Sequence, residues 1–261
     1  MTLLSTEAIV LHAVDYLESS RILRLLTRDA GVQSVLARGA RTSRKRFGSA
    51  LDLFAQGQAE LQVKDGRDLH TLASFEVTTS RSGIGHDLVR FTAAAAFAEV
   101  VLRIVHDESA VRVFASVAET MQRIETAATS DVTADAIGGI WRLAGETGVA
   151  PALDICAACH RKIDLADDVR FNHRAGGALC ERCGSASPGS RRLPASARQA
   201  IAAWINGDPV RLDEASTERA HQRLLREFLV EHLADARSLK AYAIWEAGEW
   251  SSGMEIGESD L

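Results

Sequence analysis

The feature that most constrains the fold of this chain is a pair of Cys-x-x-Cys motifs, which contain all four cysteines of the sequence. Twenty residues separate the two motifs. A two-residue gap lets both sulfurs of one motif reach the same ion, and four thiolates complete the tetrahedral ligand set that Zn²⁺ prefers. The spacing therefore predicts a structural zinc site, with the ligands Cys156, Cys159, Cys180 and Cys183.

Other uses of the four cysteines remain open: two disulfides, a redox-active motif, or buried thiols that pack as small apolar groups. His160 and His173 lie in the same segment, and either imidazole could replace a thiolate. Because four cysteines already complete a tetrahedron, surface histidines without a metal are the simpler interpretation. The start of the chain lacks a basic, cleavable leader, and its longest apolar run, Ala93 to Ala98, is too short for a bilayer. We therefore expect a cytoplasmic protein with no membrane partner and with reduced thiols.

The first eighty residues carry the signals of strands and tight turns. Short apolar runs follow one another with a turn at Asp29 to Gly31, which predicts a hairpin. Further on, apolar and polar residues alternate from Ala59 to Val63, and Asp65-Gly66 is a typical hairpin turn before a return strand from about Leu69 to Val77. Five short strands without a helical period predict a small closed or nearly closed β-barrel. The first three apolar runs are Ile9 to Leu11, Ile22 to Thr27 and Val32 to Ala37.

After residue 80 the apolar residues recur at helical spacing. In the first helix the stripe begins at Leu88 and Phe91, and in the last it includes His232, which we interpret as a packing residue. The fold class is therefore α+β, with a barrel followed by a mainly helical domain. We expect helices over His86 to His106, Ser109 to Thr126, about Asp131 to Gly148, Ala197 to Ile205 and about Asp213 to Trp245.

The cysteine segment, residues 153–192, interrupts this helical region. It is polar and broken by Gly176-Gly177 and by a cluster of Ser, Gly and Pro after Cys183, so it is poorly equipped to form a hydrophobic core of its own. Metal binding would supply the missing folding free energy, which is on the order of 10 kcal/mol for structural zinc in isolated peptides. We expect a barrel domain over residues 1–80, a helical domain over 81–247 and an acidic, disordered tail over 248–261.

Charge is distributed unevenly along the chain. The formal net charge is −5, yet five of the nine residues from 38 to 46 are basic and none is acidic. This stretch falls between two predicted strands, where loops on a rigid barrel commonly carry binding residues. Guanidinium and ammonium groups bind phosphates, and an aromatic ring can stack on a base. The stretch predicts a contact with single-stranded nucleic acid, or otherwise a solvated loop whose aromatic ring anchors the next strand. Its residues are Arg38, Arg41, Arg44, Lys45, Arg46 and Phe47.

The order of these features resembles the RecO family of bacterial recombination mediators. The resemblance begins with Glu7 to Leu11, runs through Asp15-Tyr16 and Leu26-Thr27 to Arg38-Gly39-Ala40-Arg41, and continues with a Leu51 to Phe54 strand. It extends through the four-cysteine segment and the last long helix, so it covers almost the whole chain. No single motif is diagnostic, but their order and spacing together are specific.

This resemblance implies an N-terminal OB-fold, a helical domain with a zinc site, and no catalytic turnover. It also implies binding of single- and double-stranded DNA and annealing of complementary strands, at the nucleoid when the protein acts on DNA. The implied partners are RecR, in some bacteria RecF, the acidic C-terminal tail of single-strand-binding protein, and RecA, which is loaded onto the coated strand. The tail site would need apolar residues beside Arg or Lys on the helical domain.

Two other functions fit parts of the sequence. In a zinc-ribbon or transcription-type factor the cysteine segment itself would touch the nucleic acid, but its basic residues are nearly balanced by acidic ones. In a zinc enzyme one coordination position would stay open for water, whereas two symmetric Cys-x-x-Cys pairs are typical of a closed structural site. No phosphate-binding loop or nucleophile elbow supports the enzyme interpretation.

Overall fold

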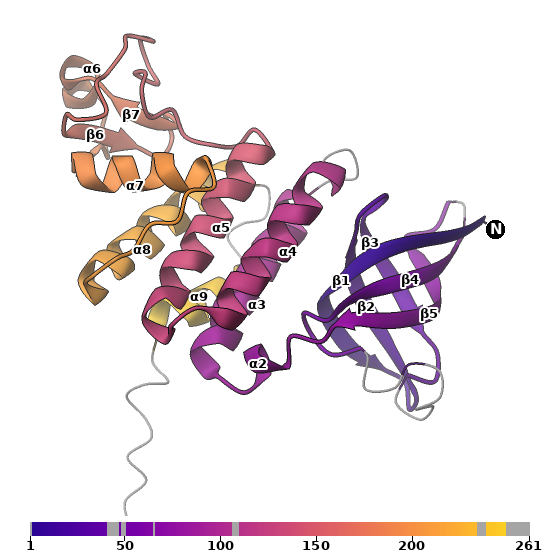
Figure 1. Cartoon of the computed structure of the whole chain (residues 1–261). Coiled ribbons are helices and arrows are strands. Elements are labelled where there is room, and N and C mark those ends of the chain that lie inside the picture. Colours follow the sequence, from indigo (N-terminus) through magenta and orange to yellow (C-terminus); the bar gives the residue numbers. More distant parts are fainter. Residues whose placement is uncertain are drawn as a thin grey trace, which may run out of the picture.

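A computed structural model describes residues 2–40, 47, 51–64, 66–105, 110–233 and 239–248. Figure 1 shows a β-barrel at one end, a set of helices in the middle and a small sheet at the other end. The fold is thus α+β, with an N-terminal strand-rich part followed by a helical part, as the sequence predicts. None of the helices in the described ranges combines the length and the hydropathy that a membrane span needs.

The barrel contains five strands that close in the order β1-β2-β3-β5-β4. Its neighbouring strands are antiparallel except for β3 and β5, which pair in parallel through Ser34 to Leu36. The predicted strands are therefore present, but the expected strand over Leu51 to Phe54 is absent. This stretch is a turn in which Phe54 has a φ of 70°, and its ring packs edge-on against Phe91 at 5.9 Å. The strands are β1 (Thr2–Tyr16), β2 (Ser20–Thr27), β3 (Gly31–Ala37), β4 (Gln56–Val63) and β5 (Leu69–Thr79).

Strand β1 is buried on both faces. Ala8 and Val10 point into the barrel core, whereas Ile9 and Leu11 belong to the core of the helical part. The pairing with β2 shifts register between Val10 and His12, so Leu11 is an extra, bulged residue. A bulge reverses which side chains face inward, since strand residues alternate between faces. The continuous apolar run from Ile9 to Leu11 is explained by burial on two sides.

The helical part packs around α3. Helices α4 and α5 each bury apolar side chains at helical spacing. The stripe predicted for helix α3 is not its buried face, because α3 contacts α4, α5, α9 (Lys240–Ala247) and β1 and is buried on several sides. Leu88 on its predicted stripe is 52% exposed, whereas Phe97 and Val101 are buried. The helices of this part are α2 (Ser82–Gly85), α3 (Leu88–Ile104), α4 (Ala110–Thr126), the 3-10 turn η2 (Thr129–Asp131) and α5 (Val132–Glu146).

The single helix expected over Asp213 to Trp245 is wrong: two helices are present. Helix α8 (Ala215–His232) ends where Leu233 takes an extended backbone, and α9 (Lys240–Ala247) follows. Glu99 of α3 accepts the backbone N–H groups of Lys240 and Tyr242 at 2.9 and 3.0 Å, so α9 begins on the surface of α3. The apolar residues continue through this region without Gly or Pro, and their spacing alone does not reveal the break.

Arg81 connects the barrel to the helices. Its side chain is 4% exposed, and its guanidinium donates to the carbonyl of Phe54 at 3.0 Å, to Gln56 Oε1 at 2.6 Å and to the carbonyl of Ala118 on α4 at 3.3 Å. Burial lowers the pKa of this guanidinium from its ordinary value, and the carboxylates of Glu125 and Glu7 oppose that shift. One side chain therefore joins the last turn before β4, the start of β4 and helix α4.

The cysteine segment forms a small sheet in the order β7-β6-β8. Its buried apolar side chains, among them Phe171 and Leu193, join the core of the helical part instead of forming a separate one. This agrees with the prediction that the segment lacks a core of its own. Its elements are β6 (Val169–Asn172), β7 (Gly177–Leu179), α6 (Glu181–Ala186) and β8 (Arg191–Leu193). The chain continues into α7 (Ala195–Ile205), which ends at Ile205 as predicted.

Candidate metal centre and nucleic-acid surface

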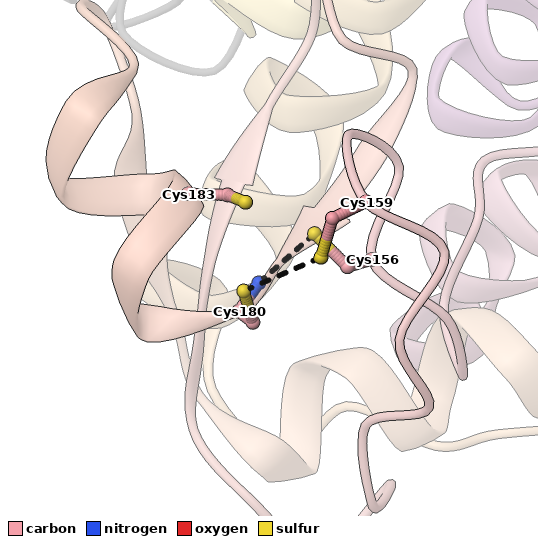
Figure 2. Close-up of side chains that lie close together, drawn as sticks. All are labelled: Cys156, Cys159, Cys180 and Cys183. Carbon is pink, nitrogen blue, oxygen red and sulfur yellow. Dashed lines mark hydrogen bonds between the residues drawn. The ribbon is translucent and has the colours of Figure 1, made fainter.

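The four cysteines converge on one point. Their sulfur atoms all lie within 4.8 Å of one another, and Cys159 Sγ is 3.8 Å from Cys180 Sγ (Figure 2). A tetrahedral site with Zn–S distances of about 2.3 Å has sulfur separations of about 3.8 Å. The arrangement therefore fits a four-thiolate metal site. Cys156 is fully buried, and the other three cysteines are partly buried.

Two tight turns bring the sulfurs together. In the first, His160 N–H donates to the carbonyl of Cys156 at 2.8 Å, and a bridge between Ile155 and Lys162 closes the loop. The positive φ of His160, 58°, allows this reversal. In the second, Cys180 follows β7 directly and its backbone N–H donates to Cys156 Sγ at 3.4 Å. Each motif is thus fixed by backbone hydrogen bonds, and the two motifs are joined by one.

The protonation of the cluster is uneven. Burial disfavours the Cys156 thiolate, but backbone N–H groups of Cys180, Cys159 and Ala158 donate to its sulfur and lower its pKa to about 6. The neighbouring sulfurs of Cys180 and Cys159 raise the pKa of Cys183 to about 12. Thiolates this close repel one another. A bound cation would remove that repulsion, which is a second reason why the donor set suits a metal.

The histidines of the segment have other roles. Neither His160 nor His173 belongs to the sulfur cluster. His173 Nε2 lies 3.0 Å from Glu227 Oε2, and its carbonyl oxygen is 2.7 Å from Nε2 of His232 on α8. The His232 ring also packs on Phe228 with ring centroids 4.3 Å apart. These contacts attach the cysteine segment to α8, which agrees with a packing role for His232.

The basic stretch begins where β3 ends. Arg38 is exposed in the turn after Ala37. Four of its predicted contact residues, Arg41, Arg44, Lys45 and Arg46, lie outside the described residues. Phe47 is 2% exposed and belongs to the barrel core, so its ring has no free face for a base. The predicted stacking role of Phe47 is therefore wrong: the ring packs in the barrel core, because burying its apolar surface is more favourable than exposing it to solvent.

A cavity of about 430 Å³ lies between β8, α7 and α8. Phe171, Leu193 and Leu224 form part of its apolar lining, and Arg191 and Arg223 also line it. Arg191 pairs with Glu227 at 3.1 Å. The sequence signal for this site was the Arg191-Arg192 pair before an apolar residue, but only the fold brings α8 next to it.

Two family models match the chain: "Recombination protein O N terminal" over residues 1–81 and "Recombination protein O C terminal" over residues 85–241. Several relatives carry the name DNA repair protein RecO. That of Anaeromyxobacter sp. (strain Fw109-5) is 36% identical over 203 residues, which cover 76% of this chain and 78% of the relative. That of Rubrobacter xylanophilus is 32% identical over 244 residues, which cover 92% and 96%. The chain therefore belongs to the RecO family, and its role lies in DNA repair and recombination.

Proposed function

We propose that this protein is a non-enzymatic recombination mediator that binds single- and double-stranded DNA, anneals complementary strands and helps RecR to load RecA onto DNA coated by single-strand-binding protein. The observation that carries the proposal is the cluster of five basic residues in positions 38–46, at the end of a barrel strand in a RecO-family chain whose net charge is −5. The protein would act in the cytoplasm, at the nucleoid when bound to DNA.

The barrel supports this assignment. Its order β1-β2-β3-β5-β4, with a parallel β3 and β5 pair at the closure, is the strand order that we assign to an OB-fold. OB-folds bind single strands along a basic groove. Arg38, Arg41, Arg44, Lys45 and Arg46 would neutralise phosphates on two strands and so reduce their mutual repulsion. Base pairing then drives annealing, and no ATP is consumed.

We assign Zn²⁺ to the four-cysteine cluster as a structural ion. All four ligands come from the protein, so no coordination position is left for water or substrate. The ion would fasten the two turns of a segment that contributes its apolar side chains to the helical core. In this proposal zinc stabilises the segment and takes no part in contact with DNA.

The cavity between β8, α7 and α8 is our candidate for the acidic C-terminal tail of single-strand-binding protein. An apolar floor beside arginines matches a peptide that ends in apolar and acidic groups. Arg223 has no ion-pair partner among the described residues, which leaves its guanidinium available for a carboxylate. RecR, and RecF where it is present, would bind elsewhere, and RecA would be a functional partner.

Salt-dependent binding of a labelled single-stranded oligonucleotide tests the proposal. We expect the double variant Arg44→Ala with Arg46→Ala to bind about tenfold more weakly, with a salt slope lower by about 1.4 because two phosphate contacts are lost. The matched control is Arg174→Ala with Arg219→Ala, two exposed arginines outside the barrel. Wild-type protein should anneal complementary strands without ATP. Equal affinity of both variants, or absence of annealing, would reject the proposed role of the loop.

The zinc-ribbon alternative is tested by crosslinking. If the cysteine segment touched DNA itself, ultraviolet crosslinks would map to residues 156–183. Our proposal expects them in the barrel instead. Four acidic residues in that range face five basic ones, which makes it a poor phosphate clamp.

A further inference from the structure

The junction between the barrel and the helices contains a second basic site. A cavity of about 640 Å³ lies between strands β1 and β2 and helices α3 and α9. Three positive side chains line it, Arg24, Arg103 and Lys240, together with His12 and one carboxylate, that of Glu99. With histidine counted as neutral, the lining carries a charge of +2 in a chain whose net charge is −5. The lining of the cavity is therefore positively charged although the chain as a whole is negatively charged.

The bulge in β1 creates this site. Ala8 and Val10 before the bulge face the barrel core, so an uninterrupted strand would direct His12 inward as well. The extra residue Leu11 turns His12 outward and pairs it with Arg24 on β2. An anion placed between them would meet the guanidinium of Arg24 and the ring N–H group of His12.

The one carboxylate of the lining has backbone hydrogen-bond partners. Glu99 accepts the backbone N–H groups of Lys240 and Tyr242 and so caps the start of α9. Among the residues that the structure describes, neither Arg24 nor the side chain of Lys240 has an ion-pair partner, and both residues are exposed. Within the described part of the chain, the two cations thus line one cavity without an acidic side chain paired to either.

The lining also contains apolar groups. Leu53 and Leu102 line the cavity and are partly buried. A cavity of this size is comparable with a site for a small ligand. Cations beside apolar groups suit the phosphates and bases of a single strand.

Strand β2 links the site to the start of the predicted DNA-binding loop. The loop leaves β3 after Ala37, which pairs with Arg21 on β2. Arg24 is three residues further along the same strand, a distance of about 10 Å. A second cavity, lined by Arg21 and Leu53, lies at the same junction, and Leu53 lines both cavities.

On the basis of the function proposed above, we propose that the cavity lined by Arg24, Arg103 and Lys240 is a second contact site for the phosphate backbone of single-stranded DNA. The strand bound by the basic loop continues along β2 into the junction, where His12 and Arg24 face it from the barrel and Lys240 faces it from α9. The barrel and the helical part then hold one strand together.

The test compares charge-removing double variants in binding of a labelled poly-dT oligonucleotide across a salt series. We expect Arg24→Gln with Lys240→Gln to lower affinity about tenfold and the salt slope by about 1.4. The control Arg174→Gln with Arg219→Gln removes the same charge from exposed sites elsewhere and should leave both quantities near wild type. Arg24→Lys retains the charge and should retain most of the affinity.

A photo-crosslinking amino acid placed at His12 should crosslink to the same oligonucleotide. Wild-type affinity in the junction variant, together with no crosslink from position 12, would overturn the inference. If the loop variant still lost binding, the proposed function would stand and only the second site would fail. If wild-type protein bound no single strand at all, both would fail. Unchanged thermal unfolding and zinc content would confirm that the variants are folded.

Discussion

The two small β-structures at opposite ends of the molecule are stabilised in different ways (Figure 1). The barrel encloses its own apolar core, which includes Leu23, Leu25 and Leu61. The sheet of the cysteine segment encloses none, and its apolar residues Phe171 and Leu193 pack into the helical core. One end depends on burial of its own side chains, and the other depends on its neighbours and on four thiolates. The two ends should therefore respond to different perturbations.

The largest expected effect comes from removing a cysteine. Structural zinc contributes a binding free energy on the order of 10 kcal/mol in isolated peptides, so Cys180→Ser should unfold the cysteine segment. We expect bound zinc to fall from one ion per chain to none, and protease cleavage to appear within residues 153–192. DNA affinity should remain near wild type, because the barrel has its own core.

The matched control for this change is Ser185→Ala, an exposed position in α6 next to the ligands. It should retain zinc and resist protease. Retention of a full zinc complement by Cys180→Ser would show that the cluster is not the metal site. Loss of the barrel in the same variant would show that the two ends are not independent.

Two glycine substitutions, one at each end of the molecule, test whether the two ends are stabilised independently. A Cβ atom at Gly177 would lie 2.3 Å from the carbonyl oxygen of Ala152, and one at Gly57 would lie 2.2 Å from that of Glu76. Either clash requires a backbone shift, and each alanine variant should lose about 3 kcal/mol of unfolding free energy.

The two variants should differ in what they lose. Gly177→Ala should weaken zinc binding and leave DNA affinity intact, whereas Gly57→Ala should do the reverse. Gly85→Ala is the control, since no atom lies within 4 Å of its added Cβ, and its unfolding free energy should change by less than about 0.5 kcal/mol. If both variants lost zinc binding and DNA affinity equally, the ends would form one cooperative unit.

Acid should weaken the end that carries the cysteine segment. His221 on α8 is 4% exposed, and burial lowers its pKa to about 4 from an ordinary value of 6.5. Between pH 6.5 and 4 the imidazole is protonated in the unfolded chain but neutral in the folded protein. The free energy of unfolding therefore has its full value above pH 6.5 and falls as the pH drops toward 4. At about 1.4 kcal/mol per pKa unit, the loss is about 3 kcal/mol.

Denaturant titration at several pH values measures this loss. The variant His221→Gln cannot take up the proton, and its unfolding free energy should fall less steeply between pH 6.5 and 4 than that of wild type. The difference between the two curves isolates His221 from the carboxylates that also titrate in this range. Parallel curves would mean that the imidazole is not protonated on unfolding.

The smallest effect is expected at the start of α3. The carboxylate of Asp87 accepts the backbone N–H groups of Val89 at 2.9 Å and Arg90 at 3.1 Å. Loss of such an N-cap costs about 1 kcal/mol, so Asp87→Ala should lower Tm by about 2 to 4 °C. Asp68→Ala removes the same charge from an exposed turn and should leave Tm unchanged. Because α3 contacts β1 of the barrel and α5 and α9 of the helical part, this change should weaken the connection between the barrel and the helices.

Much of the architecture follows from local patterns in the sequence. The alternation from Ala59 to Val63 predicts a strand because successive side chains in a strand point to opposite faces. The run Ile9 to Leu11 predicts one because a short apolar run near turn signals is typical of a buried strand. The cysteine cluster follows from spacing, since a two-residue gap limits where the second sulfur can lie. These predictions required no knowledge of distant neighbours.

Other features depend on contacts that a linear pattern does not contain. The buried face predicted from Leu88 is wrong because α3 is covered on several sides. The end of α8 at His232 is not predicted because no Gly or Pro marks it in the sequence. Phe47 follows a basic run, yet its ring is buried in the barrel. The junction site joins Arg24 to Lys240, which are more than two hundred residues apart.

Arg81 has a consequence for protein engineering. Its guanidinium reaches back to Phe54 and Gln56 and across to Ala118, so its hydrogen-bond acceptors come from both sides of the boundary between barrel and helices. A chimera that exchanges the barrel for that of a relative, with the crossover near residue 81, would separate this donor from its acceptors unless the incoming sequence supplies equivalent ones. Barrel, linker and the facing turn of α4 should therefore be transplanted as one unit.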